Sequence, residues 1–127
     1  MATDSMFEAF RRAEMLLAER RPLDALRALR PVLDEAPHAR SVHLLAGRAY
    51  LLSAQFHRAE QSFRRVLEID PSDDYARFAL GRTLQRQGRL SEAHTQLRLA
   101  VTMRPSSPEY QEALGEVRAR LAVQGDD

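Results

Sequence analysis

The sequence predicts an all-α fold made of three helix-turn-helix units in tandem and a seventh helix at the C-terminal end. The first observation is an interval of 34 residues between recurring prolines, alanines and glycines. The second is that glycine and proline fall, with one exception, at the edges of helical segments, without the alternation typical of strands. An interval shared by several positions indicates a repeat architecture. These positions are Pro37, Pro71 and Pro105; Ala25, Ala59 and Ala93; and Gly47 and Gly81, with Ala13 one interval earlier.

The first two helices have recognisable start signals. The first is predicted to begin after Asp4 or Ser5, where Ser5-x-x-Glu8 resembles a capping box, and to run to about Glu19. The second is predicted to begin at Pro22, because the N–H group that proline lacks would have no partner in a first turn.

The one proline that does not fall at the edge of a helical segment is Pro31, which lies inside the second helix. A proline there removes one backbone hydrogen bond and crowds the carbonyl of Arg27, at a cost of about 3 kcal/mol in a straight helix. We therefore expect a kink or a short break at Pro31, with the helix ending before Pro37.

The remaining helices are bounded by turn residues. Asp73 can cap the fifth helix, and Ser107-Pro108-Glu109 combines a capping serine, a first-turn proline and a carboxylate near the positive helix end. Residues 125–127 are expected to fray. The predicted ranges are 40–53, 56–68, 74–88, 90–103 and 108–123.

The repeated residues resemble the tetratricopeptide repeat (TPR), a 34-residue helix-turn-helix unit. The middle unit carries His43-x2-Ala46-Gly47-x2-Tyr50, then Phe56, Ala59, Phe63 and Pro71. The next carries Leu80-Gly81-x2-Leu84, then Gly88, Ala93, Leu97, Ala100 and Pro105. The first unit is more degenerate and keeps Leu16, Ala25, Leu29, Val32 and Pro37.

The resemblance implies a right-handed α-solenoid. We expect residues 1–127 to form one domain, with repeats at about 6–39, 40–73 and 74–107 and a capping helix at about 108–123. Gly47 and Gly81 should lie where paired helices cross, opposite Ala59 and Ala93. Departures from the pattern should cost stability: Ala9, His43 and Arg77 replace a bulky first residue, and Ala54 replaces the turn glycine.

Composition excludes several classes of function. With 19 basic against 18 acidic residues in 127, the chain lacks the basic excess of a nucleic-acid or membrane-surface protein. The absence of cysteine excludes disulfides, thiolate zinc sites and cysteine nucleophiles. The first residues do not resemble a signal peptide, and no apolar run approaches the roughly 20 residues of a membrane span. We expect a soluble, cytoplasmic protein.

Residue patterns for catalysis or metal binding are not found. The four histidines include no pair three or four residues apart on one helix, so a metal site is not expected. The acidic segment 70–74 lacks the glycine and distal glutamate of a calcium loop and is better explained as a turn between repeats. We predict a protein without enzyme activity, metal or cofactor.

In TPR proteins the first helix of each pair lines a concave face, and the resemblance implies that this face binds a partner. The central inner helix is apolar nearly all round, so either the flanking repeats cover it or it forms an apolar trough with an arginine rim. The expected groove residues are Phe10, Glu14 and Leu17; Leu44, Leu45, Arg48, Leu51 and Leu52; and Tyr75, Phe78, Arg82 and Arg86.

Charge suggests the chemistry of that partner. Residues 74–107 carry a net charge of +4 (six arginines, two acids), and residues 108–127 carry −3 (two arginines, five acids). This favours a protein segment with apolar anchors and carboxylates, either an amphipathic helix or an extended tail. Alternatively, the arginines pair with the acidic last helix or are solvated.

The leading hypothesis is a protein-binding adaptor or scaffold, and the alternative is a self-associating structural, assembly or chaperone component. A third hypothesis, nucleic-acid binding, conflicts with the near-zero net charge. TPR domains that clamp the C-terminal carboxylate of heat-shock chaperones use Lys, Asn and Arg at set positions. The matching residues here are Phe10, Glu14, Leu45, Tyr75 and Ala79, which argues against that type of clamp.

Overall fold

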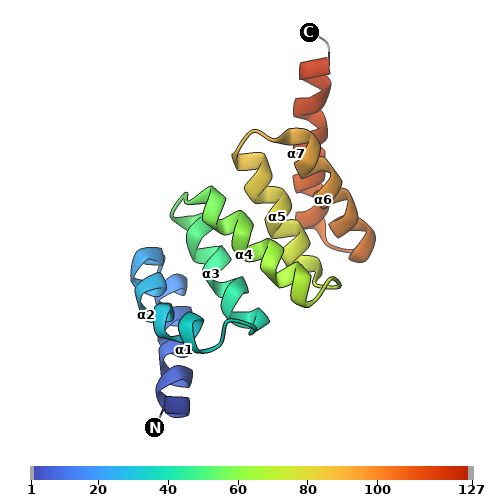
Figure 1. The fold of residues 1–127 in the computed structure, drawn as a ribbon. Coiled ribbons are helices and arrows are strands. Elements are labelled where there is room, and N and C mark those ends of the chain that lie inside the picture. Colours follow the sequence, from blue (N-terminus) through green and yellow to red (C-terminus); the bar gives the residue numbers. More distant parts are fainter. Residues whose placement is uncertain (1, 126–127) are drawn as a thin grey trace.

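The computed structural model describes the backbone of residues 2–125 and the side chains of residues 5–125. Within that range the chain forms helices joined by short turns and no strands, and the helices stack into an elongated array with the termini at opposite ends (Figure 1). The all-α repeat solenoid is therefore confirmed. The helices are α1 (Ala2–Ala18), α2 (Pro22–Glu35), α3 (Arg40–Leu52), α4 (Phe56–Ile69), α5 (Asp74–Arg86), α6 (Leu90–Met103) and α7 (Pro108–Gly125).

Most predicted boundaries hold to within two residues, and α6 matches at both ends. The predicted start of the first helix is wrong, because the backbone is already helical at Ala2 and Ser5 lies inside the helix instead of capping it. Fraying at Gly125 is also not observed, since α7 includes this residue, while Asp126 and Asp127 lie outside the described residues.

The predicted break at Pro31 is wrong, because α2 continues without interruption to Glu35. Pro31 and Arg27 are both exposed, so water can bind the carbonyl that loses its backbone donor. The opposite face of α2 keeps its buried side chains Ala25, Leu29 and Val32. Packing on that face holds the helix through the proline.

The turn inside each helix pair has the same geometry three times. Arg20, Ala54 and Gly88 adopt φ angles of 61°, 59° and 76°, in the left-handed region that favours glycine. The residue after each of them donates its N–H to a carbonyl five positions back, at 2.8–3.0 Å. This is the Schellman arrangement, and it reverses the chain so that the two helices pack antiparallel.

Two glycines bring the paired helices close together, as predicted. A Cβ atom added at Gly47 would lie 2.6 Å from Cε1 of Phe63, and one added at Gly81 would lie 2.6 Å from Cγ of Leu97. The partner side chains therefore lie four residues after the predicted Ala59 and Ala93, although both alanines are fully buried. Gly115, one interval later on α7, has no atom within 4 Å of such a Cβ.

The apolar interior consists of two clusters. One is formed by α1, α2 and α3 around Leu29 and Leu45, and the other is formed by α4 to α7 around Phe63 and Leu97. Tyr50 on α3 is partly buried and packs against both clusters. It therefore joins the two halves of the array.

Two of the residues that replace the bulky first residue, His43 and Arg77, bind the turn before their own helix, as does their counterpart Gln111 on α7. In three successive units the side chain at that position contacts the carbonyl oxygen of the recurring proline six residues earlier. Each contact ties a helix to the turn that leads into it, which offsets part of the apolar packing that a bulky residue would supply. The pairs are His43 Nε2 with Pro37 (2.7 Å), Arg77 Nη2 with Pro71 (3.2 Å) and Gln111 Nε2 with Pro105 (2.5 Å).

The array has an inner and an outer side. In the described part of the chain, the backbone of α1 approaches that of α3, α3 approaches α5 and α5 approaches α7, whereas the backbones of α2, α4 and α6 do not approach one another. The odd-numbered helices therefore lie closer together, on the inner side of the curve. α7 packs on α6 and α5 and covers the end of the core with Tyr110, Leu114 and Val117.

Candidate functional site

The inner side contains a hollow of about 850 Å³, which we call the concave groove. It is lined by the odd-numbered helices and by the turn after α1. A volume of this size is within the range of protein binding pockets. Its lining residues are Leu17, Ala18, Arg20, Arg48, Leu51, Leu52, Tyr75, Phe78, Ala79, Arg82, Gln85, Arg86, Glu109 and Glu116.

The structure brings most of the predicted groove residues together at this hollow. They are Leu17, Arg48, Leu51, Leu52, Tyr75, Phe78, Arg82 and Arg86. Four predicted residues do not line it. Phe10 and Leu44 pack against the two apolar clusters, Leu45 is buried in one of them, and Glu14 is exposed elsewhere on α1.

Sequence reasoning missed six lining residues, and part of the signal was present. Glu109 and Glu116 belong to α7, which was interpreted only as a cap, although it is the next inner-type helix by the 34-residue interval. Gln85 lies between the two predicted arginines Arg82 and Arg86 on α5. The others are Ala18 and Ala79, which are small, and Arg20, whose backbone turn has no specific sequence signal.

The apolar part of the groove combines aliphatic and aromatic side chains. Leu52 and Tyr75 remain 39% and 37% exposed, so their apolar surface is available to a ligand. Phe78 is buried beside them, stacked on Tyr110 of α7 with ring centroids 4.6 Å apart. The flanking repeats therefore cover part of the inner apolar surface and leave part of it open.

Arg82 is occupied by contacts within the protein. Its Nη1 atom donates to Glu116 Oε2 at 2.9 Å and to Gln85 Oε1 at 3.1 Å, and Gln85 donates to the same carboxylate. These bonds from Gln85 and Arg82 lower the pKa of the Glu116 carboxyl below its ordinary value. For Arg82, therefore, the alternative in which the arginine pairs with the acidic last helix is the correct one.

Of the four lining arginines, Arg20, Arg48 and Arg86 have no ion pair among the described residues. The Arg86 guanidinium lies over the ring of Phe56, 5.1 Å from its centroid, a contact that leaves its charge available. Burial raises the pKa of the Tyr75 phenol, and the positive charge of Arg48 opposes that rise. The lining carries four arginines against two glutamates, and one of the two glutamates is already paired.

Among the described residues, no group of three or more His, Asp or Glu side chains is arranged to hold a metal ion. None of the helices between residues 2 and 125 is both long and apolar enough to span a membrane. The site thus consists of an apolar surface, three arginines without an ion pair among the described residues, and the carboxylates of Glu109 and Glu116.

Comparison with known proteins decides the family. Profiles described as tetratricopeptide repeat match residues 51–117 and residues 10–74, so that together they cover most of the chain. The chain belongs to the tetratricopeptide repeat family. No curated protein sequence matches this TPR protein. TPR domains are generally interaction modules without catalytic function.

Solved structures agree with this TPR fold. The Arabidopsis OM64 TPR domain is 16% identical, with 94% of this chain and 98% of that chain covered and a TM-score of 0.87. The second TPR domain of human RPAP3, solved in complex with the HSP70 peptide SGPTIEEVD, is 15% identical, with coverages of 93% and 98% and a TM-score of 0.84. The Yersinia enterocolitica translocator chaperone SycD is 20% identical, with coverages of 97% and 85% and a TM-score of 0.79. At these identities the likeness concerns the fold alone.

Proposed function

We propose that this TPR protein is a non-enzymatic adaptor whose concave groove binds a segment of a partner protein. The observation that carries the proposal is the combination, in one hollow, of exposed apolar surface with three arginines (Arg20, Arg48 and Arg86) that have no carboxylate partner among the described residues. Apolar side chains of the segment contact Leu52 and Tyr75, and its carboxylates contact Arg48 and Arg86. The coarser conclusion, a protein-interaction module, follows from the family.

The peptide complexes of similar folds support an acidic segment. The second TPR domain of human RPAP3 is solved in complex with a peptide that ends in EEVD, so a domain of similar fold binds an acidic chain. The positions that would form a clamp for a C-terminal carboxylate carry other chemistry here, including Phe10, Glu14 and Tyr75. We therefore assign acid recognition to Arg48 and Arg86, which act on carboxylates along the segment.

The test is a selection from a random twelve-residue peptide library on the immobilised protein, followed by fluorescence anisotropy titration of the enriched peptides. We expect the enriched peptides to contain both acidic and large apolar residues. The double variant Arg48→Glu, Arg86→Glu should bind them about 5- to 30-fold more weakly, because it removes two partly exposed attractions of up to about 1 kcal/mol each.

A matched control makes the same change in net charge at two positions outside the groove. Arg98 and Arg120 are exposed on α6 and α7 and do not line the groove, so Arg98→Glu with Arg120→Glu should leave affinity within twofold. Equal affinity of the groove variant and the control would remove the groove arginines from the mechanism. If the only effect of the enriched peptides is to reduce self-association of the protein in light scattering, the alternative of a self-associating structural component is favoured.

A further inference from the structure

The outer side of the array contains a second hollow surface, between α2 and α4. Two adjoining hollows of about 680 Å³ and 320 Å³ share Leu33, Tyr50 and Arg58. The backbones of α2 and α4 do not approach each other, and α3 lies beneath them as the floor. We call this surface the convex furrow and define it by Leu26, Arg30, Leu33, Tyr50, Gln55 and Arg58.

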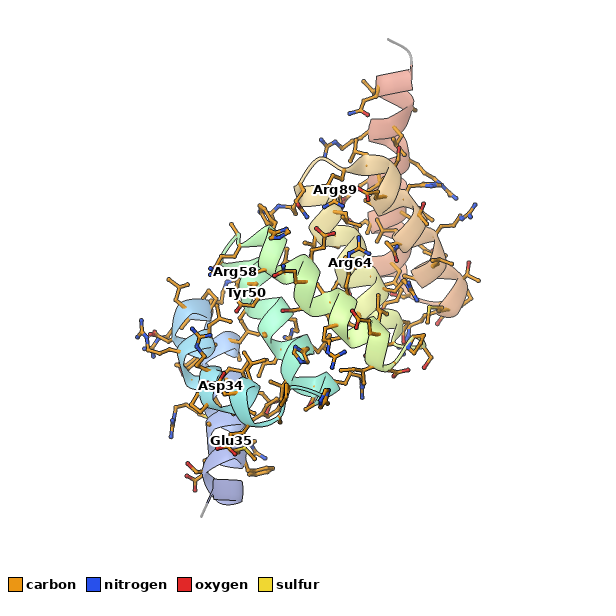
Figure 2. All side chains as sticks on the ribbon, viewed as in Figure 1. Asp34, Glu35, Tyr50, Arg58, Arg64 and Arg89 are labelled. Carbon is orange, nitrogen blue, oxygen red and sulfur yellow. The ribbon has the colours of Figure 1, made fainter. Side chains whose placement is uncertain are left out.

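The corresponding positions one interval later are filled by an ion-pair network. There Glu60 stands in the place of Leu26, and its carboxylate binds Arg64 at 3.0 Å and Arg89 at 2.7 Å. Arg89 also binds Glu92 at 2.6 Å. Glu60 is only 7% exposed, so the network closes the space between α4 and α6. Figure 2 shows Tyr50 and Arg58 together beside α2, and Arg64 and Arg89 one repeat further along the array.

The convex furrow lacks this network because three of its positions differ in charge, and Gln55 stands in the place of Arg89. Leu26 replaces the central glutamate, and Arg58 stands where Glu92 stands one interval later. Arg30, the counterpart of Arg64, has no ion pair or side-chain hydrogen bond among the described residues, and Arg58 donates only to the neutral Gln55. Two exposed positive charges are therefore left without a carboxylate.

The floor of the furrow is apolar. Leu26, Leu33 and Tyr50 are only partly buried, whereas Leu84, the counterpart of Tyr50, is fully buried. None of the residues that line the two hollows is acidic, and the other two lining arginines, Arg27 and Arg65, are already paired with Asp24 and Glu68. The surface thus combines an apolar floor with uncompensated positive charge.

We propose that the convex furrow is a second docking surface, independent of the concave groove, for an acidic protein segment that carries an apolar side chain between carboxylates. The apolar side chain contacts Leu33 and Tyr50, and the carboxylates take the place that Glu60 and Glu92 occupy in the next repeat. Charge complementarity favours this occupant. A nucleic acid would need a larger basic excess than a chain with a net charge of +1 provides.

The probe is a capped hexapeptide of two glutamates, leucine, phenylalanine and two glutamates, titrated into the ¹⁵N-labelled full chain and followed by amide chemical shifts. We expect saturable shifts centred on residues 26, 33 and 50, unchanged in the groove variant Arg48→Glu, Arg86→Glu. The same peptide with lysines in place of glutamates should give none. The absence of saturable shifts at residues 26, 33 and 50 with the acidic peptide, including the case in which all shifts lie in the concave groove around Tyr75, would overturn the proposal.

A graft from the next repeat provides the sharpest variant. Leu26→Glu with Gln55→Arg installs the counterparts of Glu60 and Arg89 without altering net charge, so the furrow supplies its own carboxylate and peptide affinity should fall at least tenfold. Arg30→Glu with Arg58→Glu, both exposed and therefore compatible with folding, should cause a loss at least as large. The charge-matched control Arg98→Glu, Arg120→Glu should bind normally.

Three results would contradict the proposal. Retained binding in both the graft and the double reversal would show that the furrow does not hold the peptide. A uridine decanucleotide that shifts the same residues at lower concentration would assign the surface to nucleic acid. Sedimentation showing a dimer that the double reversal dissociates would assign it to a second copy of the chain.

Discussion

Substituting alanine at Gly47, Gly81 and Gly115 should have opposite effects on stability, although all three glycines occupy the same position of the repeat. Alanine in a helix interior is favoured over glycine by up to about 1 kcal/mol, and this gain is common to the three sites. The sites differ in the space for a methyl group. At Gly81 the added Cβ would meet Cγ and Cδ2 of Leu97 at 2.6 and 2.7 Å, whereas at Gly115 it meets nothing within 4 Å.

The strain can be estimated from the packing. Leu97 is fully buried and its backbone nitrogen lies 3.4 Å from the added Cβ, so neither the side chain nor the backbone can move away freely. Overpacking of this kind costs about 1–3 kcal/mol. Because the helical gain cancels in the comparison, Gly81→Ala should be less stable than Gly115→Ala by about that amount. Gly47→Ala should behave like Gly81→Ala, since Phe63 is equally buried.

Urea unfolding followed by far-ultraviolet circular dichroism measures the difference, provided that the dependence on urea concentration is unchanged between variants. The double variant Gly81→Ala, Leu97→Ala supplies a test of cause. If the clash with Leu97 is responsible, the free-energy loss of the double variant is smaller than the sum of the two single losses. Equal unfolding midpoints for Gly81→Ala and Gly115→Ala would refute the reasoning.

Three further predictions concern the turns and the buried charge. Ala54→Gly should raise the melting temperature by a few degrees, because alanine at φ 59° costs about 1 kcal/mol that glycine does not. Burial alone would raise the pKa of Glu60, but bonds from Arg89 and Arg64 bring it below the ordinary 4.5. The stability that the ionised carboxylate contributes is therefore present above pH 4.5 and is lost as the pH falls through the lowered pKa. In urea unfolding at pH 7, Glu60→Gln should therefore have a free energy of unfolding about 1–3 kcal/mol below that of the native chain. The difference should be smaller at about pH 3.5. Asp73→Ala should cost about 1–2 kcal/mol of unfolding free energy and Asp73→Asn less, because asparagine keeps the helix cap and loses only the 2.6 Å ion pair with Arg40.

The helices and their pairing could be predicted because the responsible residues act locally or recur at a fixed interval. Pro22 and the turn at Gly88 mark boundaries by their own backbone requirements, and Gly47 and Gly81 mark the close approach of two helices. Pro31 misled the prediction because its backbone cost is local, whereas the packing that holds α2 together comes from other helices.

The site was harder to predict because it depends on how side chains are shared between neighbours. Phe10 and Leu44 have the spacing of groove residues, but they are partly buried where they pack against the apolar clusters. The occupation of Arg82 by Glu116 depends on two helices 34 residues apart. In sequence, His43 and Arg77 are departures from the repeat. Only the structure shows that these chemically different side chains each bind the carbonyl of the recurring proline six residues earlier.

The unequal contacts on the two sides of the array have a mechanical consequence. The closely spaced inner helices act as a fulcrum, while α2 and α4, whose backbones do not approach each other and which no ion pair joins among the described residues, have more room to spread or approach when the array flexes. Bending of the array would therefore change the width of the inner and outer hollows in opposite directions, so that curvature is the geometric quantity that both surfaces have in common.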